Sequence, residues 1–146
     1  MIPIIVLAVL SLDQIAKFLA TKYLLPQQSI PVVKGIFQLT LVFNRGAAFG
    51  ILKNQVPLFI LTSLFAIVLI CFNLKNNRYA RLYRISLSLI LAGAIGNLID
   101  RVIFGHVIDF LDFRIWPVFN FADSAITVGA ILLGWCIIRP AKTTLK

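Results

Sequence analysis

The sequence predicts an all-α membrane protein with four transmembrane helices and a small extracytoplasmic β-rich loop. Of its 146 residues, 60% are hydrophobic and only 13% are charged, whereas an ordinary globular protein has about 45–50% and about 25%. The mean hydropathy is +0.98. A soluble domain of this size needs far more polar surface to cover its core. We therefore expect a single integral membrane domain over residues 1–146.

Four apolar stretches have about the length that a membrane-spanning helix requires. About 20 apolar residues cross the roughly 30 Å of hydrocarbon in a bilayer. Only helices and closed barrels satisfy their backbone hydrogen bonds there, and none of the stretches alternates as a strand does. The first stretch has no basic n-region or cleavage site, so we expect it to be retained rather than removed as a signal peptide. The expected spans are about 2–19, 56–74, 85–99 and 119–138.

The basic residues predict which side of the membrane each loop occupies. Cytoplasmic loops carry an excess of Lys and Arg. Neither the link between the second and third spans nor the C-terminal tail contains an acidic residue, and together they hold seven basic ones. We therefore expect both termini in the cytoplasm and the loops at about 21–55 and 100–118 outside. The seven residues are Lys75, Arg78, Arg81, Arg84, Arg139, Lys142 and Lys146.

The first outer loop is long enough to hold structure of its own. From Ile36 to Phe43, successive residues fall alternately on two faces. This period of two predicts a short amphipathic sheet lying against the membrane surface. Such a loop could cover a site at the membrane surface and exclude water from it.

The charged residues point to the membrane and to a cluster of acids. The net charge is +9, from fourteen basic and five acidic residues. In a soluble protein this would suggest nucleic acid, but here the basic residues flank apolar runs. Lipid headgroups therefore account for them, and we expect no nucleic-acid partner. There is no Glu, and four of the five Asp residues fall within one 24-residue window: Asp100, Asp109, Asp112 and Asp123.

Several classes of catalytic site are excluded by what the sequence lacks. His106 is the only histidine, which excludes a two-His zinc site. No serine lies in a nucleophile-elbow sequence, and there is no P-loop or G-x-G-x-x-G motif. Cys71 and Cys136 each lie within an apolar run, so we expect them to pack or to face lipid. We expect no metal and no cofactor, which leaves carboxylate, amide and guanidinium chemistry.

Two groups of polar residues lie at the ends of predicted spans. Asp13 and Lys17 are spaced i, i+4 on one helix face, so they could form an ion pair that fastens the helix or orient a site by hydrogen bonds. Asn97, Asp100 and Arg101 share one face if the third helix continues. They could meet headgroups and water, or converge on a site. Small residues just before them would let a neighbouring helix approach closely: Ala92 and Gly96.

The remaining carboxylates could form a catalytic pair. Asp123 begins the fourth apolar run, where an N-cap role would also explain it. Two carboxyl groups in a partly dry site share one proton. The ionised member can take a proton from an attacking water, and the protonated member can donate to a carbonyl oxygen. The spacing leaves Asp100, Asp109 and Asp112 all open as the partner of Asp123.

Together these segments resemble the lipoprotein signal peptidases (signal peptidase II). The resemblance covers essentially the whole chain, and its motifs occur in the family's order. It implies a bacterial membrane aspartic endopeptidase that removes the signal peptide from diacylglyceryl-modified prolipoproteins, cutting just before the lipidated cysteine. The motifs are Asp-Gln-x-x-Lys at 13–17, FNRGAAFG at 43–50, GNLIDR at 96–101, VIDF at 107–110 and FNFADS at 119–124.

The resemblance also assigns residues and partners. It makes Asp109 and Asp123 the catalytic aspartates, in the cytoplasmic (inner) membrane and toward its extracytoplasmic face. The stretch from Asp109 to Asn120 is short for the family, which affects the shape of the outer loop. Partners are prolipoprotein substrates and membrane lipids, and we expect a monomer. The supporting or substrate-binding residues are Asp13, Lys17, Asn44, Arg45, Asn97, Asp100, Arg101 and Asn120.

Two other functional classes remain to be compared with a peptidase. A small proton-coupled transporter or channel would use intramembrane Asp residues as relays. However, the acids gather at one interface, the second span has none, and no paired broken helices are evident. A structural assembly subunit would account for the hydrophobicity but not for the grouping of the Asp residues.

Overall fold

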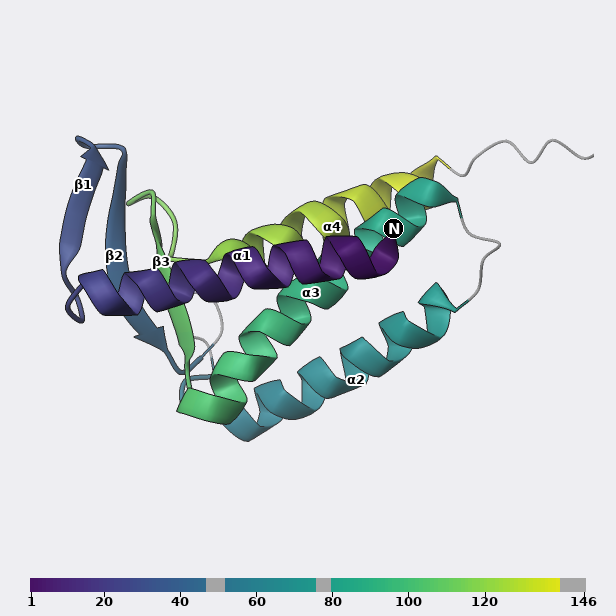
Figure 1. Ribbon diagram of the computed structural model, residues 1–146, viewed down its shortest axis with the longest axis horizontal. Helices are drawn as coiled ribbons and strands as arrows, with labels where there is room; N and C mark the ends of the chain where they lie inside the picture. The colour runs from purple at the N-terminus through teal and green to yellow at the C-terminus, as the bar shows by residue number, and fades with distance from the viewer. Residues whose placement is uncertain (47–51, 76–79, 140–146) are drawn as a thin grey trace, which may run out of the picture.

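The computed structural model describes residues 1–46, 52–75 and 80–139. The four helices are each long and apolar enough to cross a membrane, and the strands form one small sheet at one end of the helix bundle (Figure 1). α1 begins and α4 ends at the opposite end of the bundle. In chain order the elements are α1 (Ile2–Tyr23), β1 (Ser29–Val33), β2 (Phe37–Asn44), α2 (Val56–Leu74), α3 (Arg81–Phe104), β3 (Val107–Asp112) and α4 (Phe121–Ile138).

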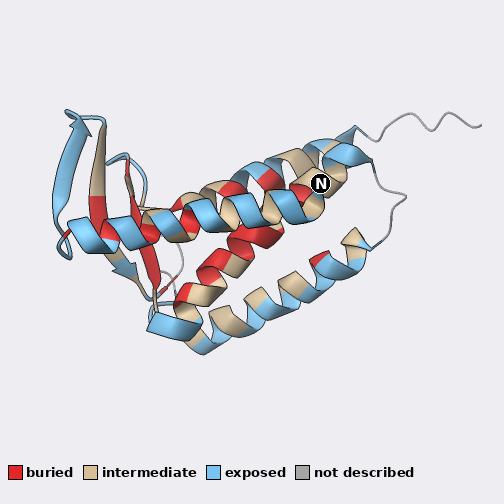
Figure 2. Ribbon diagram, viewed as in Figure 1, coloured by how far each residue is buried: buried red, intermediate tan, exposed pale blue. Residues whose placement is uncertain are grey.

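α3 is the central helix of the bundle. Most of its inner residues are buried, whereas α1, α2 and α4 present long exposed apolar faces, as lipid-facing helices do (Figure 2). Small residues let its neighbours approach: a Cβ atom on Gly96 would lie 2.7 Å from Asp13 Oδ2. Gly93 faces the backbone of Ala122 in the same way. The predicted close approach is therefore confirmed at Gly96, on the side that faces α1, and Ala92 is buried.

At the sheet end of the bundle, two helices extend beyond the predicted spans. α1 continues to Tyr23 instead of residue 19, and α3 continues to Phe104 instead of residue 99. The predicted third span stops at residue 99, beside the charged Asp100, which the sequence allows either to meet headgroups and water or to join a site. Asp100 is fully buried and satisfied by protein groups, so the helix continues past it. It ends at Gly105, whose φ of 72° is the left-handed conformation that closes a helix.

The sheet is antiparallel, in the order β1-β2-β3. β2 confirms the sheet predicted from the alternation at 36–43. β3 was not predicted, because five of its six residues are buried and it shows no alternation of polar and apolar positions. Its register with β2 places Val42 opposite Asp109 and Asn44 opposite Val107. A cluster of buried apolar residues attaches the sheet to the end of α1: Ala20, Leu24, Leu41, Ile108 and Phe110.

Candidate active site

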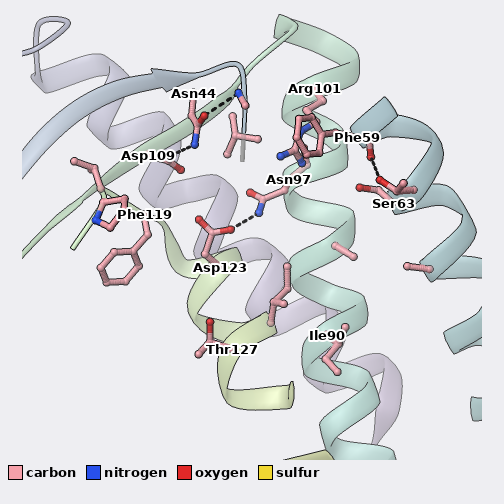
Figure 3. A pocket seen from close by; sticks show the side chains of 18 of the residues that line it. Asn44, Phe59, Ser63, Ile90, Asn97, Arg101, Asp109, Phe119, Asp123 and Thr127 are labelled. Carbon is pink, nitrogen blue, oxygen red and sulfur yellow. Dashed lines mark hydrogen bonds between the residues drawn. The ribbon is translucent and has the colours of Figure 1, made fainter. Parts of the chain in front are cut away.

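A cavity of about 500 Å³ lies where the sheet meets the helices. Its charged and amide-bearing residues come from four elements, namely β2, α3, β3 and α4, and α2 adds apolar and hydroxyl side chains to its wall (Figure 3). The charged and amide-bearing residues of the lining are Asn44, Asn97, Arg101, Asp109 and Asp123. The topology therefore brings together residues that are up to 79 positions apart in the chain.

Asp109 lies in the middle of β3 and only 1% of it is exposed. Both of its carboxyl oxygens accept hydrogen bonds from amide groups: Asn44 Nδ2 donates at 2.9 Å and Asn120 Nδ2 at 2.7 Å. The backbone fixes which way each amide points. The N–H of Gly46 donates to Asn44 Oδ1, and the N–H of Asp123 donates to Asn120 Oδ1. Both asparagines must therefore present their NH₂ groups to Asp109.

Asp123 lies in the first turn of α4, and its side chain points toward Asn97 on α3 (Figure 3). Asn97 Nδ2 donates to Asp123 Oδ1 at 2.7 Å. Asn120, not Asp123, is the N-cap of α4, because its Oδ1 accepts the N–H of Asp123 at 2.8 Å. The N-cap explanation of Asp123 is therefore wrong, and its carboxyl group is left facing the cavity.

A buried ion cluster lies behind Asn97 and Asn120. Lys17 Nζ is 2.8 Å from Asp13 Oδ2 and 2.8 Å from Asp100 Oδ2, and it donates to Asn97 Oδ1 at 3.0 Å. Gln14 Nε2 lies 3.2 Å from carboxylate oxygens of both aspartates. The Asp13–Lys17 ion pair predicted from the i, i+4 spacing is thus present. Lys17 also fastens α1 to α3 through its contacts with Asp100 and Asn97, and Asn97 in turn holds Asp123.

The electrostatic environment of Asp109 favours its protonated form. Burial and the nearby Asp123 carboxylate raise the pKa of Asp109 to about 7, although the hydrogen bonds from Asn44 and Asn120 and the charge of Lys17 act in the opposite direction. Asp109 can therefore gain or lose a proton near neutral pH. The guanidinium of Arg101 is near enough to interact with the charges of both aspartates.

Two residues that the sequence singled out lie away from the cavity. Asp112 accepts hydrogen bonds from Gln38, Thr40 and the backbone N–H of Arg114. Burial alone would raise the pKa of Asp112, but these hydrogen bonds outweigh it and lower the pKa. Arg45 is exposed and lies outside the described lining of the cavity. Part of the FNRGAAFG motif (47–50) and three predicted cytoplasmic residues, Arg78, Lys142 and Lys146, lie outside the described residues.

A family model described as signal peptidase (SPase) II matches residues 5–139, nearly the whole chain. The chain belongs to the signal peptidase II family. This result confirms the resemblance seen in its motifs and favours a peptidase over a transporter. The protein is a multi-pass membrane peptidase that processes prolipoprotein signal peptides.

Curated relatives and solved structures agree with the assignment to signal peptidase II. The lipoprotein signal peptidase of Caldanaerobacter subterraneus subsp. tengcongensis is 50% identical over 136 residues, which are 92% of this chain and 94% of that protein. That of Halothermothrix orenii is 48% identical over 133 residues, covering 91% and 92%. A solved structure described as a bacterial membrane enzyme matches with a TM-score of 0.91 at 29% identity, covering 99% of this chain and 92% of the other. A second one gives 0.87 at 31% identity, covering 96% and 94%.

The contribution of α2 to this signal peptidase II site was not foreseen. Phe59, Thr62 and Ser63 line the cavity, and the ring of Phe59 lies 5.0 Å from the guanidinium carbon of Arg101. The second span carries no charge, so the sequence offered only the two hydroxyl residues as a weak signal. Gln14 belongs to the Asp-Gln-x-x-Lys motif, but the sequence does not predict its contact with Asp100, because that contact depends on the fold.

Proposed function

We propose that Asp109 and Asp123 form an aspartyl dyad that hydrolyses the peptide bond just before the diacylglyceryl-modified cysteine of a prolipoprotein. The observation that carries this proposal is their placement. The two carboxyl groups come from β3 and α4, line the same cavity and interact electrostatically. Each is held by an asparagine whose own orientation is fixed, so both face a common space, and no cation among the described residues binds either of them directly.

The chemistry requires one proton shared by the pair. The ionised carboxylate takes a proton from a water molecule as the water attacks the scissile carbonyl carbon. The protonated carboxyl donates to the carbonyl oxygen, which gives a neutral tetrahedral intermediate. When the C–N bond breaks, the proton taken from water passes to the leaving nitrogen. A hydroxyl of the intermediate returns its proton to the carboxylate that had donated one, so that a carboxylic acid product forms and the pair again shares one proton. A pKa of about 7 for Asp109 supports this scheme, because a proton is then available at neutral pH.

Neighbouring groups are assigned supporting roles. Arg101 places a positive charge beside the dyad, where it can stabilise negative charge that develops during attack. Asn44, Asn97 and Asn120 fix the carboxyl groups by hydrogen bonds. Asp13, Lys17 and Asp100 form the cluster behind them. Arg45, which directly follows β2, is exposed and would contact substrate only outside the cavity.

The substrate's lipid accounts for the location of the site. Two acyl chains on the cysteine must stay in the bilayer, and the apolar residues of α2, α3 and α4 in the cavity wall suit that placement, for example Phe59, Ala66, Ile90 and Ile126. Each buried CH₂ group contributes about 0.8 kcal/mol to such binding. We assign the protein to the bacterial cytoplasmic membrane as a monomer, with both termini in the cytoplasm and the dyad toward the extracytoplasmic face.

The test is cleavage of a diacylglyceryl-modified preprotein by purified Asp109→Asn and Asp123→Asn variants. Asparagine keeps the shape of the side chain but can neither accept the proton of water nor donate an acidic one, so each variant should lose cleavage. Binding of the lipidated substrate should survive. Wild-type activity should persist in a chelator, because the scheme uses no metal. An Asp109→Asn enzyme that cleaves at the normal rate would refute the dyad, and Asp100 would then be the next candidate.

A further inference from the structure

Lys17 is bound in a way that uses its whole hydrogen-bonding capacity inside the protein. Only 2% of this residue is exposed. An ammonium group has three N–H donors, and three acceptors surround Nζ: Asp13 Oδ2 at 2.8 Å, Asp100 Oδ2 at 2.8 Å and Asn97 Oδ1 at 3.0 Å. A buried charge of this kind is costly unless it is paired and hydrogen-bonded. Lys17 is therefore a fixed structural point rather than a mobile side chain.

The first acceptor connects Lys17 to the start of α4. Asp13 also accepts a hydrogen bond through Oδ1 from the backbone N–H of Ala122, at 2.8 Å. Ala122 is fully buried and directly precedes Asp123. Asp13 therefore fixes the backbone that carries one member of the proposed dyad.

The second acceptor connects Lys17 to β3. Asp100 accepts a hydrogen bond through Oδ2 from the backbone N–H of Ile108, at 3.1 Å. Ile108 directly precedes Asp109, as Ala122 directly precedes Asp123. Each proposed dyad member therefore follows a residue whose backbone N–H is bound by an aspartate of the cluster. Lys17 binds the same Asp100 oxygen, and one ammonium thus links the backbone positions of both carboxyl groups.

The third acceptor connects Lys17 to a side chain of the dyad. Because an ammonium can only donate, it forces the oxygen of Asn97 to face Lys17 and the NH₂ group to face Asp123. Asn120 makes a second contact with the same oxygen at 3.1 Å. An ion pair that merely fastened α1 to α3 would not require this contact with Asn97.

We propose that Lys17 is a positioning residue that sets the separation and orientation of the Asp109 and Asp123 carboxyl groups. It acts through three groups, none of which is a member of the dyad: Asp13, Asp100 and Asn97. This inference rests on the proposed dyad. Removing Lys17 should leave substrate binding intact, because the binding surface is elsewhere, but should displace the carboxyl groups from the geometry that the reaction needs.

The experiment compares steady-state kinetics of purified variants on a diacylglyceryl-modified preprotein. Lys17→Met should lower kcat about 100-fold or more with KM unchanged, the scale expected for a misplaced catalytic group. Lys17→Met alone leaves two buried carboxylates unpaired, so D13N/K17M is measured as well and compared with Asp13→Asn. The double variant keeps the wild-type net charge of the cluster, and its asparagine oxygen can still accept the N–H of Ala122.

A matched control comes from the same helix. Lys22→Met removes an exposed lysine of α1 and should change neither kcat nor KM. The folded fraction of each variant is measured by circular dichroism and thermal unfolding in detergent. If kcat per folded molecule in D13N/K17M equals that of Asp13→Asn, Lys17 is only structural and the inference is wrong. If D109N and D123N are inactive in that case, the proposed dyad is still supported and only the inference about Lys17 is refuted. If D109N and D123N are active, the proposed dyad itself is refuted.

Discussion

The raised pKa of Asp109 predicts that the folded protein loses stability as the pH rises. Replacing the Asp109 carboxyl group should abolish this pH dependence. The pKa of this carboxyl moves from an ordinary value of 3.8 to about 7 in the folded protein. Each unit is worth about 1.4 kcal/mol, so the shift corresponds to about 4 kcal/mol. Because the folded pKa is the higher one, the stabilising contribution is fully present below about pH 4 and is lost as pH rises through about 7. We expect the unfolding free energy of the Asp109→Asn variant not to fall in this way as the pH rises.

The measurement is the difference in unfolding free energy between wild-type and Asp109→Asn protein in mixed detergent micelles, from pH 4 to pH 8. Using the difference removes contributions common to both proteins, such as that of Asp112, whose lowered pKa acts in the opposite direction. Loss of one acceptor for Asn44 or Asn120 adds an offset that does not depend on pH. The variant should gain about 4 kcal/mol relative to wild type over this range. A difference that stays constant with pH would refute the electrostatic reasoning.

Three further predictions follow from the site and its surroundings. Asn97→Ala and Arg101→Ala should stay folded yet lower kcat for the lipidated preprotein, and unchanged turnover in either would contradict their positioning roles. Asp112→Asn should cleave at nearly the wild-type rate but lose about 2 kcal/mol of unfolding free energy, because it weakens hydrogen bonds between β2 and β3. Cysteines placed at Lys34 and Arg78 in a background without the two native cysteines should be labelled from opposite sides of the membrane, and labelling from one side would refute the topology.

Composition and apolar run length were enough to predict the four helices. A bilayer requires about 20 apolar residues per crossing, and no soluble fold offers a competing explanation for four such runs. The helix ends were less predictable, because a charged residue ends a span only if it must reach water. Asp100 has Lys17 and the backbone of Ile108 as partners, and those partners are 83 positions before it and 8 after it in the chain.

The candidate site shows the same limit of sequence reasoning. Helical spacing placed Asn97, Asp100 and Arg101 on one face, and the structure confirms that Asn97 and Arg101 line the cavity. Spacing could not choose the proposed partner of Asp123, since which aspartate faces the cavity depends on the register of β3 against β2. The register turns Asp109 toward the cavity and places Asp112 among Gln38 and Thr40 instead. Only the resemblance to the family distinguished these aspartates beforehand.

The arrangement of charges in the described part of the chain gives a reason why asparagines, and not cations, hold the proposed dyad. An ammonium bound directly to Asp109 would lower its pKa and keep it ionised at neutral pH. The shared proton would then be lost, and with it the acid that the reaction needs. Asn44 and Asn120 fix the carboxyl group with neutral donors, whose effect on the pKa is smaller than that of burial and of Asp123. The positive charge of Lys17 reaches Asp109 only indirectly, through Asn97 and Asn120, and is balanced by Asp13 and Asp100. Rigidity and a protonatable carboxyl group can therefore coexist in one buried site.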